Sequence, residues 1–204
     1  MTAPPLPLVF LPGAGGRLDL LKPVVARLAP RRPTSLCEYP GIGHAAPLAE
    51  LLTLDDLQRH VFARLPERFD LVAKSMGGVL ALRFVLAHPE RVRKLVLLAT
   101  SGGIDVAALG GLDWRDTFRQ VQPAAPTWFS DDRTDVTAQL GNIHQHTLLV
   151  FGDDDLIAPV VVGKFLAERL PHAHLEILPK ATHDLEGEYP DLIASLIEAH
   201  LRRP

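Results

Sequence analysis

A single serine stands between an apolar run and a glycine pair in Asp70 to Leu82, which reads DLVAKSMGGVLAL. The run that ends at Ala73 has strand character and the residues from Gly78 have a helical apolar pattern, so Ser75 lies at a strand-to-helix junction. Three interpretations compete for this serine: a nucleophile held in a sharp turn, part of a phosphate-binding loop, and a helix cap without chemistry.

The phosphate-loop interpretation fails on spacing. A GxxxxGK(S/T) loop needs glycines where this chain has Arg68 and Ala73, because backbone amides must approach the phosphates without intervening side chains. The glycine cluster at Pro12–Gly16 also fails the GxGxxG pattern, since Leu18 occupies the place of its third glycine. The sequence therefore predicts no nucleotide site.

A strained turn explains the small residues on both sides of Ser75, which a plain helix cap does not. The positions two before and two after such a serine crowd together, and Ala73 and Gly77 are small. The AKSMGG stretch resembles the nucleophile elbow, usually GxSxG, of the α/β-hydrolase superfamily, in the form that carries alanine at the first glycine. The resemblance implies a serine hydrolase whose acid and histidine follow Ser75 in chain order.

The acid is expected after a later strand. The stretch FGDDDLIAP, Phe151–Pro159, resembles the family's G-x-x-D-x-x-x-P signature, which implies Asp155 as the acid. Asp153 and Asp154 are rivals by chemistry but not by spacing, and the three aspartates could also form a solvated loop that caps the next helix. A calcium site is disfavoured because consecutive aspartates lack the alternating spacing of a calcium loop.

Nine histidines compete for the role of base. His183, in ILPKATHDLEGEYP, resembles the family's loop histidine before the final helix. The two HxH pairs at residues 144–146 and 172–174 precede predicted strands, so we expect them at the opposite end of the sheet, and no third metal ligand accompanies them. His44 ends EYPGIGH, which resembles the family's D-x-P-G-x-G loop; a substrate contact is open, and a structural role in the loop is preferred.

The resemblance also implies an oxyanion hole made of two backbone amides. Met76 follows the nucleophile at the start of a helix, whose dipole favours an anion, and Ala14 takes the second place in VFLPGAGG. Pro12 stands where a histidine usually precedes the glycine, which leaves the amide of Ala14 available. The sequence PGAGG is more similar to the corresponding loops of thioesterase relatives.

The elements that must position these residues alternate between short apolar runs and longer amphipathic segments, the pattern of an α/β fold. The predicted strands are Pro7–Leu11, Thr34–Tyr39, Phe69–Ala73, Lys94–Ala99, Thr147–Phe151 and His174–Leu178. The predicted helices are Leu18–Leu28, Leu54–Leu65, Gly78–Ala87, Val160–Leu170 and Tyr189–Leu201. We expect a single α/β-hydrolase domain over residues 1–204, with helices on both faces of a mostly parallel six-stranded sheet in the order 2-1-3-4-5-6.

One interval is too long for a simple crossover between strands and is predicted to form a small helical lid, over about residues 102–146. It contains four aromatic residues proposed to contact substrate: Trp114, Phe118, Trp128 and Phe129. Trp114, Phe118 and Val121 share one face of a helix by their spacing. The aromatic residues either seal the edge of the sheet or form an apolar wall over a pocket, and the two interpretations are compatible.

The composition of the chain restricts the kinds of partner that we expect the protein to bind. The chain has 204 residues, 47% of them apolar, and a net charge of -3 without a basic stripe, which disfavours nucleic acid. One cysteine excludes an internal disulfide, and no apolar run is long enough for a membrane span. We expect a cytoplasmic protein with no metal and no cofactor.

The predicted function is hydrolysis of a carboxylic ester or thioester with a small-to-medium apolar acyl group, through Ser75, His183 and Asp155 and an acyl-enzyme. The same residues could instead serve perhydrolase, acyltransferase or lyase-type chemistry, because the fold does not separate these reactions. A relative that only binds a small molecule is the second alternative. Lys74 is interpreted as scaffold or as a charge at the pocket rim, and not as the base.

Overall fold

The computed structural model describes residues 4–203 of the chain. Six strands form one sheet in the order β2-β1-β3-β4-β5-β6, with every neighbouring pair parallel, which confirms the predicted α/β class and strand order. The strands are β1 (Leu8–Leu11), β2 (Thr34–Leu36), β3 (Phe69–Lys74), β4 (Val92–Leu98), β5 (His146–Gly152) and β6 (Ala173–Leu178).

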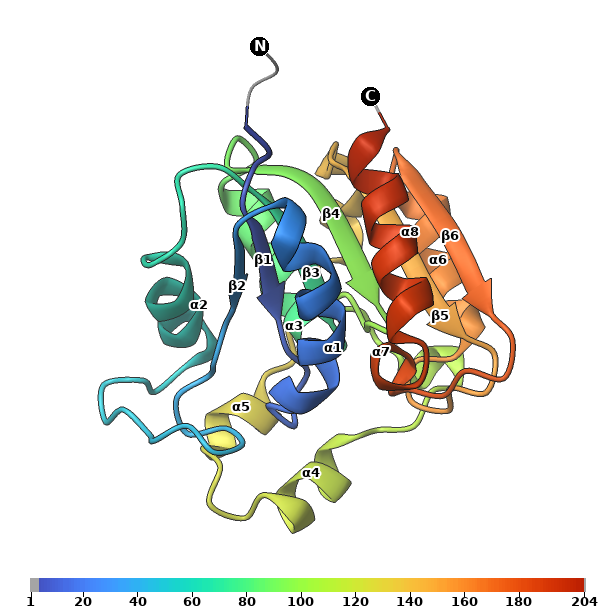
Figure 1. Cartoon of the computed structure of the whole chain (residues 1–204). Helices are drawn as coiled ribbons and strands as arrows, with labels where there is room; N and C mark the ends of the chain where they lie inside the picture. The colour runs from blue at the N-terminus through green and yellow to red at the C-terminus, as the bar shows by residue number, and fades with distance from the viewer. Residues whose placement is uncertain (1–3, 204) are drawn as a thin grey trace.

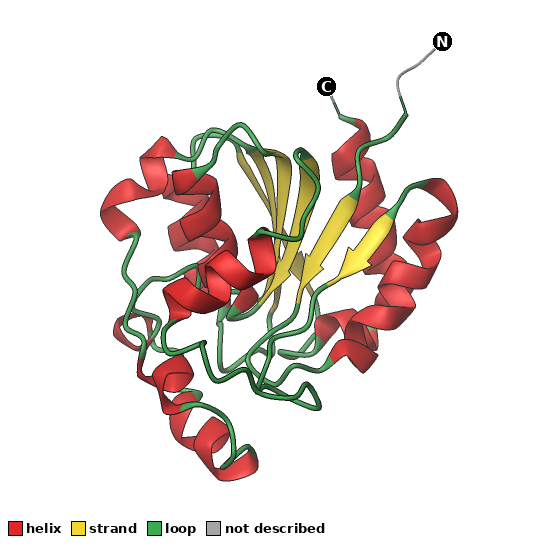
Figure 2. Ribbon diagram, turned by 90° about the vertical axis from the view of Figure 1, so that its left-hand side faces the viewer, coloured by secondary structure: helices red, strands yellow, loops and turns green. Residues whose placement is uncertain are grey.

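Helices cover both faces of the sheet, as Figure 2 shows. Helices α1 (Leu18–Leu28) and α8 (Pro190–Arg202) pack side by side on one face, in front of the sheet in Figure 1. Helices α2 (Leu54–Phe62), α3 (Gly77–Ala87) and α6 (Val160–Arg169) contribute to the apolar cluster on the other face. The short helix η1 (Ala29–Arg31) follows α1, and the short helix α7 (Leu185–Glu188) precedes α8.

The strands send alternate side chains into two apolar clusters. Leu8 and Phe10 of β1 belong to the cluster under α1 and α8, while Val9 and Leu11 belong to the cluster on the opposite face. Because both faces are covered, the middle of a central strand is apolar on both sides and reads as a continuous run, as in Leu95–Leu98 of β4. The edge strands β2 and β6 are only partly buried, which is consistent with their more polar sequences.

The observed elements follow the predicted ones, with shifts at their ends. Helix α1 has the predicted bounds, whereas β2 ends at Leu36, three residues before the predicted end at Tyr39. Tyr39 has left the sheet: its side chain is buried and its hydroxyl donates to the backbone oxygen of Pro12 at 3.0 Å. This bond connects the loop after β2 to the loop after β1.

The carboxyl ends of the strands lie along one edge of the sheet, at the bottom of Figure 1, because all six strands are parallel. Residues 99–145, between β4 and β5, contain four short helices: η2 (Ala107–Leu109), α4 (Arg115–Val121), α5 (Thr127–Asp131) and η3 (Thr137–Asn142). Figure 1 shows α4 and α5 beyond this same edge. Their proposed role as a lid stays a prediction.

None of the helices within residues 4–203 is long and apolar enough to cross a membrane. Helix α8, with 13 residues, is the longest of them. The expected cytoplasmic location and the expected absence of a nucleic-acid partner stay predictions.

Candidate active site

Ser75 occupies the sharp turn between β3 and α3. Its φ angle is +50°, in the left-handed region that a residue with a side chain adopts only under strain. Gly77, two residues later, passes so close to the loop after β1 that an added Cβ would lie 2.6 Å from the backbone oxygen of Pro12. The turn therefore requires glycine at this position, as the sequence pattern indicates.

Hydrogen bonds hold the strained turn in place. The Ser75 backbone N–H donates to the carbonyl of Leu98 at 2.9 Å, and its own carbonyl accepts from the hydroxyl of Thr100 at 2.6 Å. The Thr100 hydroxyl oxygen also accepts from the amide of Gly102 at 3.0 Å. The ends of β3 and β4 thus fix the backbone of the serine, which leaves the hydroxyl group to be oriented by other partners.

The loops after β3, β5 and β6 bring Ser75, Asp155 and His183 into one hydrogen-bonded array. His183 Nδ1 lies 2.8 Å from Asp155 Oδ2, and His183 Nε2 lies 3.0 Å from Ser75 Oγ. A carboxylate can only accept, so Nδ1 carries the proton and donates to Asp155. Nε2 is then free to accept the proton of the Ser75 hydroxyl.

Asp155 is fully buried but well satisfied. Its Oδ1 accepts from the backbone amides of Ile157 at 2.8 Å and Ala158 at 2.9 Å, while Oδ2 faces His183. Burial acts to raise the pKa of Asp155, but the hydrogen bond and charge of His183 and the two amides outweigh it, so the pKa lies below its ordinary value. The carboxylate therefore stays ionised beside the imidazole.

The surroundings of His183 favour its neutral imidazole form. Burial lowers its pKa most, and the positive charge of Lys74 lowers it further, while the hydrogen bond to Asp155 acts in the opposite direction. The net pKa lies below the ordinary histidine value. The imidazole is consequently ready to accept a proton at neutral pH.

The other two aspartates of the triplet point elsewhere. Asp153 and Asp154 are exposed, and the Asp153 carboxylate accepts from the backbone amide of Lys180 at 2.5 Å. Gly152 packs against the same loop, since an added Cβ there would lie 2.1 Å from the carbonyl of Ala181. These contacts fix the loops after β5 and β6 against each other, so that Asp155 alone of the three reaches the histidine.

Two backbone amides lie beside the serine. Met76 follows Ser75 directly, and the loop that contains Ala14 approaches closely, since a Cβ on the neighbouring Gly13 would lie 3.1 Å from Ser75 Cβ. Within residues 4–203, neither the Ala14 nor the Met76 amide donates to a backbone carbonyl or a side chain. Both amides are available to a bound group.

Two cavities meet at Ser75 and His183. One, of about 340 Å³, has charged residues on its wall, among them Arg115 and Arg133. The other, of about 540 Å³, is mainly apolar and lies between α1, α4 and α7, with Leu20 and Phe118 on its wall. Trp114 borders both of them. A molecule bound beside Ser75 and His183 therefore has room to extend in two different directions.

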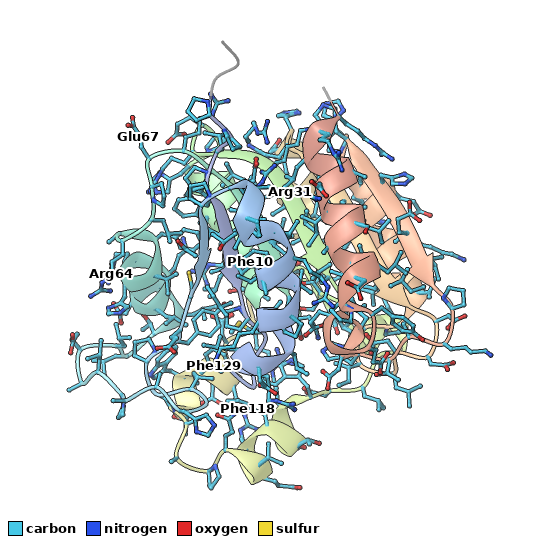
Figure 3. The ribbon with its side chains drawn as sticks, viewed as in Figure 1. Phe10, Arg31, Arg64, Glu67, Phe118 and Phe129 are labelled. Atoms are coloured by element: carbon cyan, nitrogen blue, oxygen red, sulfur yellow. The ribbon has the colours of Figure 1, made fainter. Side chains whose placement is uncertain are left out.

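The four aromatic residues proposed for substrate contact divide into two pairs. Trp114 and Phe118 border the cavities beside Ser75, whereas Trp128 and Phe129 line neither of these two cavities. Phe129 is buried, with its ring centroid 5.4 Å from that of Phe118 and 6.0 Å from that of Trp128. Figure 3 shows Phe118 and Phe129 close together beyond the ends of the strands. Trp128 and Phe129 thus anchor the residue 99–145 segment to the core.

A family model described as alpha/beta hydrolase fold matches residues 7–144, more than half of the chain. The chain belongs to the α/β-hydrolase fold family. The matched region contains β1, the turn at Ser75 and the β4–β5 segment, and the elements that follow it supply Asp155 and His183.

Several curated relatives align over most of the chain. The pimeloyl-(acyl-carrier protein) methyl ester esterase of Nitrosomonas europaea is 26% identical, with 94% of each chain covered. The poly(3-hydroxyalkanoate) depolymerase of Ectopseudomonas oleovorans is 29% identical over 84% of this chain and 76% of its own. Among solved structures, a hydrolase from Pseudomonas aeruginosa PA01 superposes with a TM-score of 0.81 at 22% identity, covering 99% of this chain and 92% of its own, which shows the shared fold.

The remaining histidines lie away from this α/β-hydrolase site. His44 is exposed and borders a separate cavity of about 440 Å³ that Ser75 does not line. The HxH pairs at residues 144–146 and 172–174 lie at the amino ends of β5 and β6, as expected from their place before the strands. In the described part of the chain, no group of three or more histidine, cysteine, aspartate or glutamate residues is arranged to hold a metal ion.

Sequence reasoning missed one feature of the site, a buried ion pair between Lys74 and Glu186. Lys74 borders the apolar cavity, but its side chain is only 5% exposed and faces a carboxylate that is 2% exposed. Glu186 lies in a run of acidic residues before the last helix, where the sequence gives no signal of burial. Only the fold brings together two charges that are separated by more than a hundred residues.

Proposed function

We propose that this protein is a serine hydrolase that cleaves a carboxylic ester or thioester, with Ser75 as nucleophile, His183 as general base and Asp155 as the acid that orients it. The observation that carries the proposal is the array of two hydrogen bonds, 3.0 Å and 2.8 Å long, that connects the three residues. Membership of the α/β-hydrolase fold family and relatives named as esterases and as a depolymerase support the same conclusion.

Acylation begins when the Ser75 hydroxyl passes its proton to His183 Nε2 and Oγ forms a bond to the carbonyl carbon of the ester. The imidazolium that results is stabilised by Asp155, whose charge is retained. The carbonyl oxygen becomes an oxyanion, for which the amides of Ala14 and Met76 are the proposed donors. Collapse of this intermediate breaks the bond to the leaving oxygen or sulfur, which takes the proton from His183.

Deacylation repeats these steps with water. His183 takes a proton from a water molecule, whose oxygen attacks the acyl carbon, and the same two amides stabilise the second oxyanion. The acyl–Oγ bond then breaks, Ser75 recovers its proton from His183, and the carboxylic acid leaves. The protein supplies every group that these steps require.

The cavities support an ester with one apolar and one more polar half. The apolar cavity of about 540 Å³ fits a small-to-medium chain against Trp114 and Phe118, and the charged wall of the other cavity suits a more polar half. Trp128 and Phe129 act on substrate only indirectly in this proposal, since they hold α4 and α5 in place.

Hydrolysis of p-nitrophenyl esters of increasing chain length tests the proposed reaction. The wild-type protein is expected to show a maximum of kcat/KM at a short or medium acyl chain, and Ser75→Ala is expected to reduce kcat/KM at least a thousandfold. Ser195→Ala is the matched control, because that serine lies on the exposed part of α8 and is expected to leave the activity unchanged. Negligible wild-type hydrolysis at every chain length, or full activity of Ser75→Ala, would count against the proposal.

A further inference from the structure

A buried lysine and a buried glutamate border the apolar cavity beside the serine. Lys74 is the last residue of β3, directly before Ser75, and Glu186 lies in α7, three residues after His183. Both side chains are almost fully enclosed, at 5% and 2% exposed. They line the mainly apolar cavity together with the serine and the histidine. Arg17, Asp113 and Asp184 also border this cavity, but among its charged residues only Lys74 and Glu186 are almost fully enclosed.

The two charges do not satisfy each other. Lys74 Nζ lies 3.8 Å from Glu186 Oε2, which is beyond hydrogen-bond distance, and Glu186 Oε2 has no hydrogen-bond partner among residues 4–203. Burial raises the pKa of Glu186, while the charge of Lys74 acts to lower it. A buried charge without hydrogen bonds is costly, and its persistence calls for a partner.

Other buried charges in this protein are satisfied internally. The fully buried carboxylate of Asp70 accepts from Arg93 at 2.8 and 2.6 Å and from Arg32 at 3.1 Å. The second buried lysine, Lys94, donates to the carbonyls of His200 and Arg203. If Lys74 and Glu186 served only in packing, equally close contacts would be expected for them. Their Nζ and Oε2 atoms instead stay 3.8 Å apart, and Oε2 has no hydrogen-bond partner among residues 4–203.

We propose that Lys74 and Glu186 form a subsite for a hydroxyl group carried by the substrate close to its scissile carbonyl. Glu186 Oε2 is closed to solvent in the structure, so the proposal includes a small rotation of the carboxylate toward the cavity. A substrate hydroxyl can then accept from the ammonium and donate to the carboxylate at once. An anionic group would be repelled by Glu186, a cationic group would be repelled by Lys74, and an alkyl group would leave both charges unpaired. The substrate class is therefore a hydroxylated ester or thioester of otherwise apolar character.

This inference rests on the proposed function, since the subsite is defined relative to the acyl group on Ser75. It adds a selectivity that the apolar wall alone cannot provide. A site built to hydrogen-bond a hydroxyl discriminates strongly against the analogue that lacks it, because the polar groups of the site are then left unpaired.

Matched pairs of esters test the subsite in the wild-type protein. In a pH-stat at pH 7.5, kcat/KM is measured for methyl butyrate and for its 2-, 3- and 4-hydroxy derivatives, with methyl 3-methylbutyrate as a control for shape. A second set places the hydroxyl on the alcohol half, with butyl acetate and its hydroxybutyl counterparts. We expect at least one hydroxylated ester to exceed its parent by about tenfold or more, as hydrogen bonds to charged groups predict.

A double variant locates the source of this preference. Lys74→Met/Glu186→Leu replaces the pair by apolar side chains of similar size, and the ratio of hydroxylated to parent kcat/KM is expected to fall to about one. The ratio is internal to each variant, so a change in overall activity does not affect it. Lys94→Met removes the other buried lysine, at the opposite end of the sheet, and is expected to keep the wild-type ratio.

Two results would overturn the proposal: equal rates for parent and hydroxylated esters in the wild type, as expected if the two charges interact only with each other, or an unchanged preference in the double variant. Either result leaves the hydrolase mechanism in place, provided that the parent esters are cleaved in a Ser75-dependent manner. Failure to cleave any ester would instead refute the proposed function. The ratio of hydroxylated to parent kcat/KM in the wild type can refute the proposed subsite even if the double variant does not fold.

Discussion

Replacement of Asp155 by asparagine separates the role of its charge and acceptor geometry from its role in packing. The Oδ1 atom accepts from two backbone amides, of Ile157 and Ala158, so the side-chain oxygen of an asparagine is expected to keep this position. The NH₂ group then replaces Oδ2, at the atom that lies 2.8 Å from His183 Nδ1. Two donors would face each other unless the imidazole changes its tautomer.

The tautomer change reverses the hydrogen bond to the serine. With Nδ1 as acceptor of the asparagine NH₂, the proton of His183 resides on Nε2, which then donates to Ser75 Oγ and can no longer accept its proton. The corresponding change in the serine-protease array lowers kcat about 10⁴-fold, equivalent to about 5.5 kcal/mol of activation free energy. Because the array here has the same partners at hydrogen-bond distance, we expect a loss of this order for Asp155→Asn.

The assay compares kcat of p-nitrophenyl butyrate hydrolysis for the wild type, Asp155→Asn and Asp154→Asn. Asp154 is adjacent and exposed, so its variant controls for the loss of one negative charge in the loop and is expected to stay within twofold of the wild type. Thermal unfolding of each variant checks the fold. The reasoning is refuted if Asp155→Asn keeps more than a tenth of the wild-type kcat, or if Asp154→Asn loses as much.

Three further predictions follow from the environment of single residues. Because burial and then the charge of Lys74 lower the pKa of His183, the acid limb of kcat/KM should lie below pH 6.5, and Lys74→Met should move it to higher pH; a shift to lower pH would contradict this account. Gly77→Ala places a Cβ 2.6 Å from a backbone oxygen and should lower the free energy of unfolding in urea by about 1–3 kcal/mol. Gly141→Ala is the control: its added Cβ would meet no neighbouring atom within 4 Å, so it should change the free energy of unfolding by less than about 0.5 kcal/mol. Burial and nearby positive charge lower the pKa of His200 to about 4, so on acidification the unfolded state takes up the proton at a higher pH than the folded state does. The free energy of unfolding should therefore fall by up to about 3 kcal/mol as the pH drops from about 6.5 to 4. His200→Gln should lose this part of the pH dependence, and an unchanged pH profile of the variant would argue against this account.

The strand-to-helix junction at Ser75 shows why much of the fold could be predicted from the sequence. Strands buried on both faces read as continuous apolar runs, and their parallel order places the loops after β3, β5 and β6 at one edge. Small residues at 73 and 77 indicate the crowding of the turn, which the φ angle of +50° at Ser75 bears out. These expectations followed from the residue types next to Ser75 and from the order of the strands along the chain.

Contacts between distant segments could not be predicted in the same way. Val121 shares a helical face with Phe118 by spacing, yet it is the last residue of α4 and is 69% exposed. Trp128 and Phe129 pack into the core and do not line the cavities beside Ser75, which depends on how α5 docks and not on residue type. The buried contact between Lys74 and Glu186 likewise depends on where the fold places α7.

The central claim is that Ser75 is a nucleophile activated by His183. Labelling with a fluorophosphonate probe, followed by peptide mass mapping, tests it most directly, because the probe forms a stable bond only with an activated serine. We predict one adduct per chain, located on Ser75, which is lost in Ser75→Ala and nearly lost in His183→Ala. No labelling of the wild type, or undiminished labelling of Ser75→Ala, would contradict the claim.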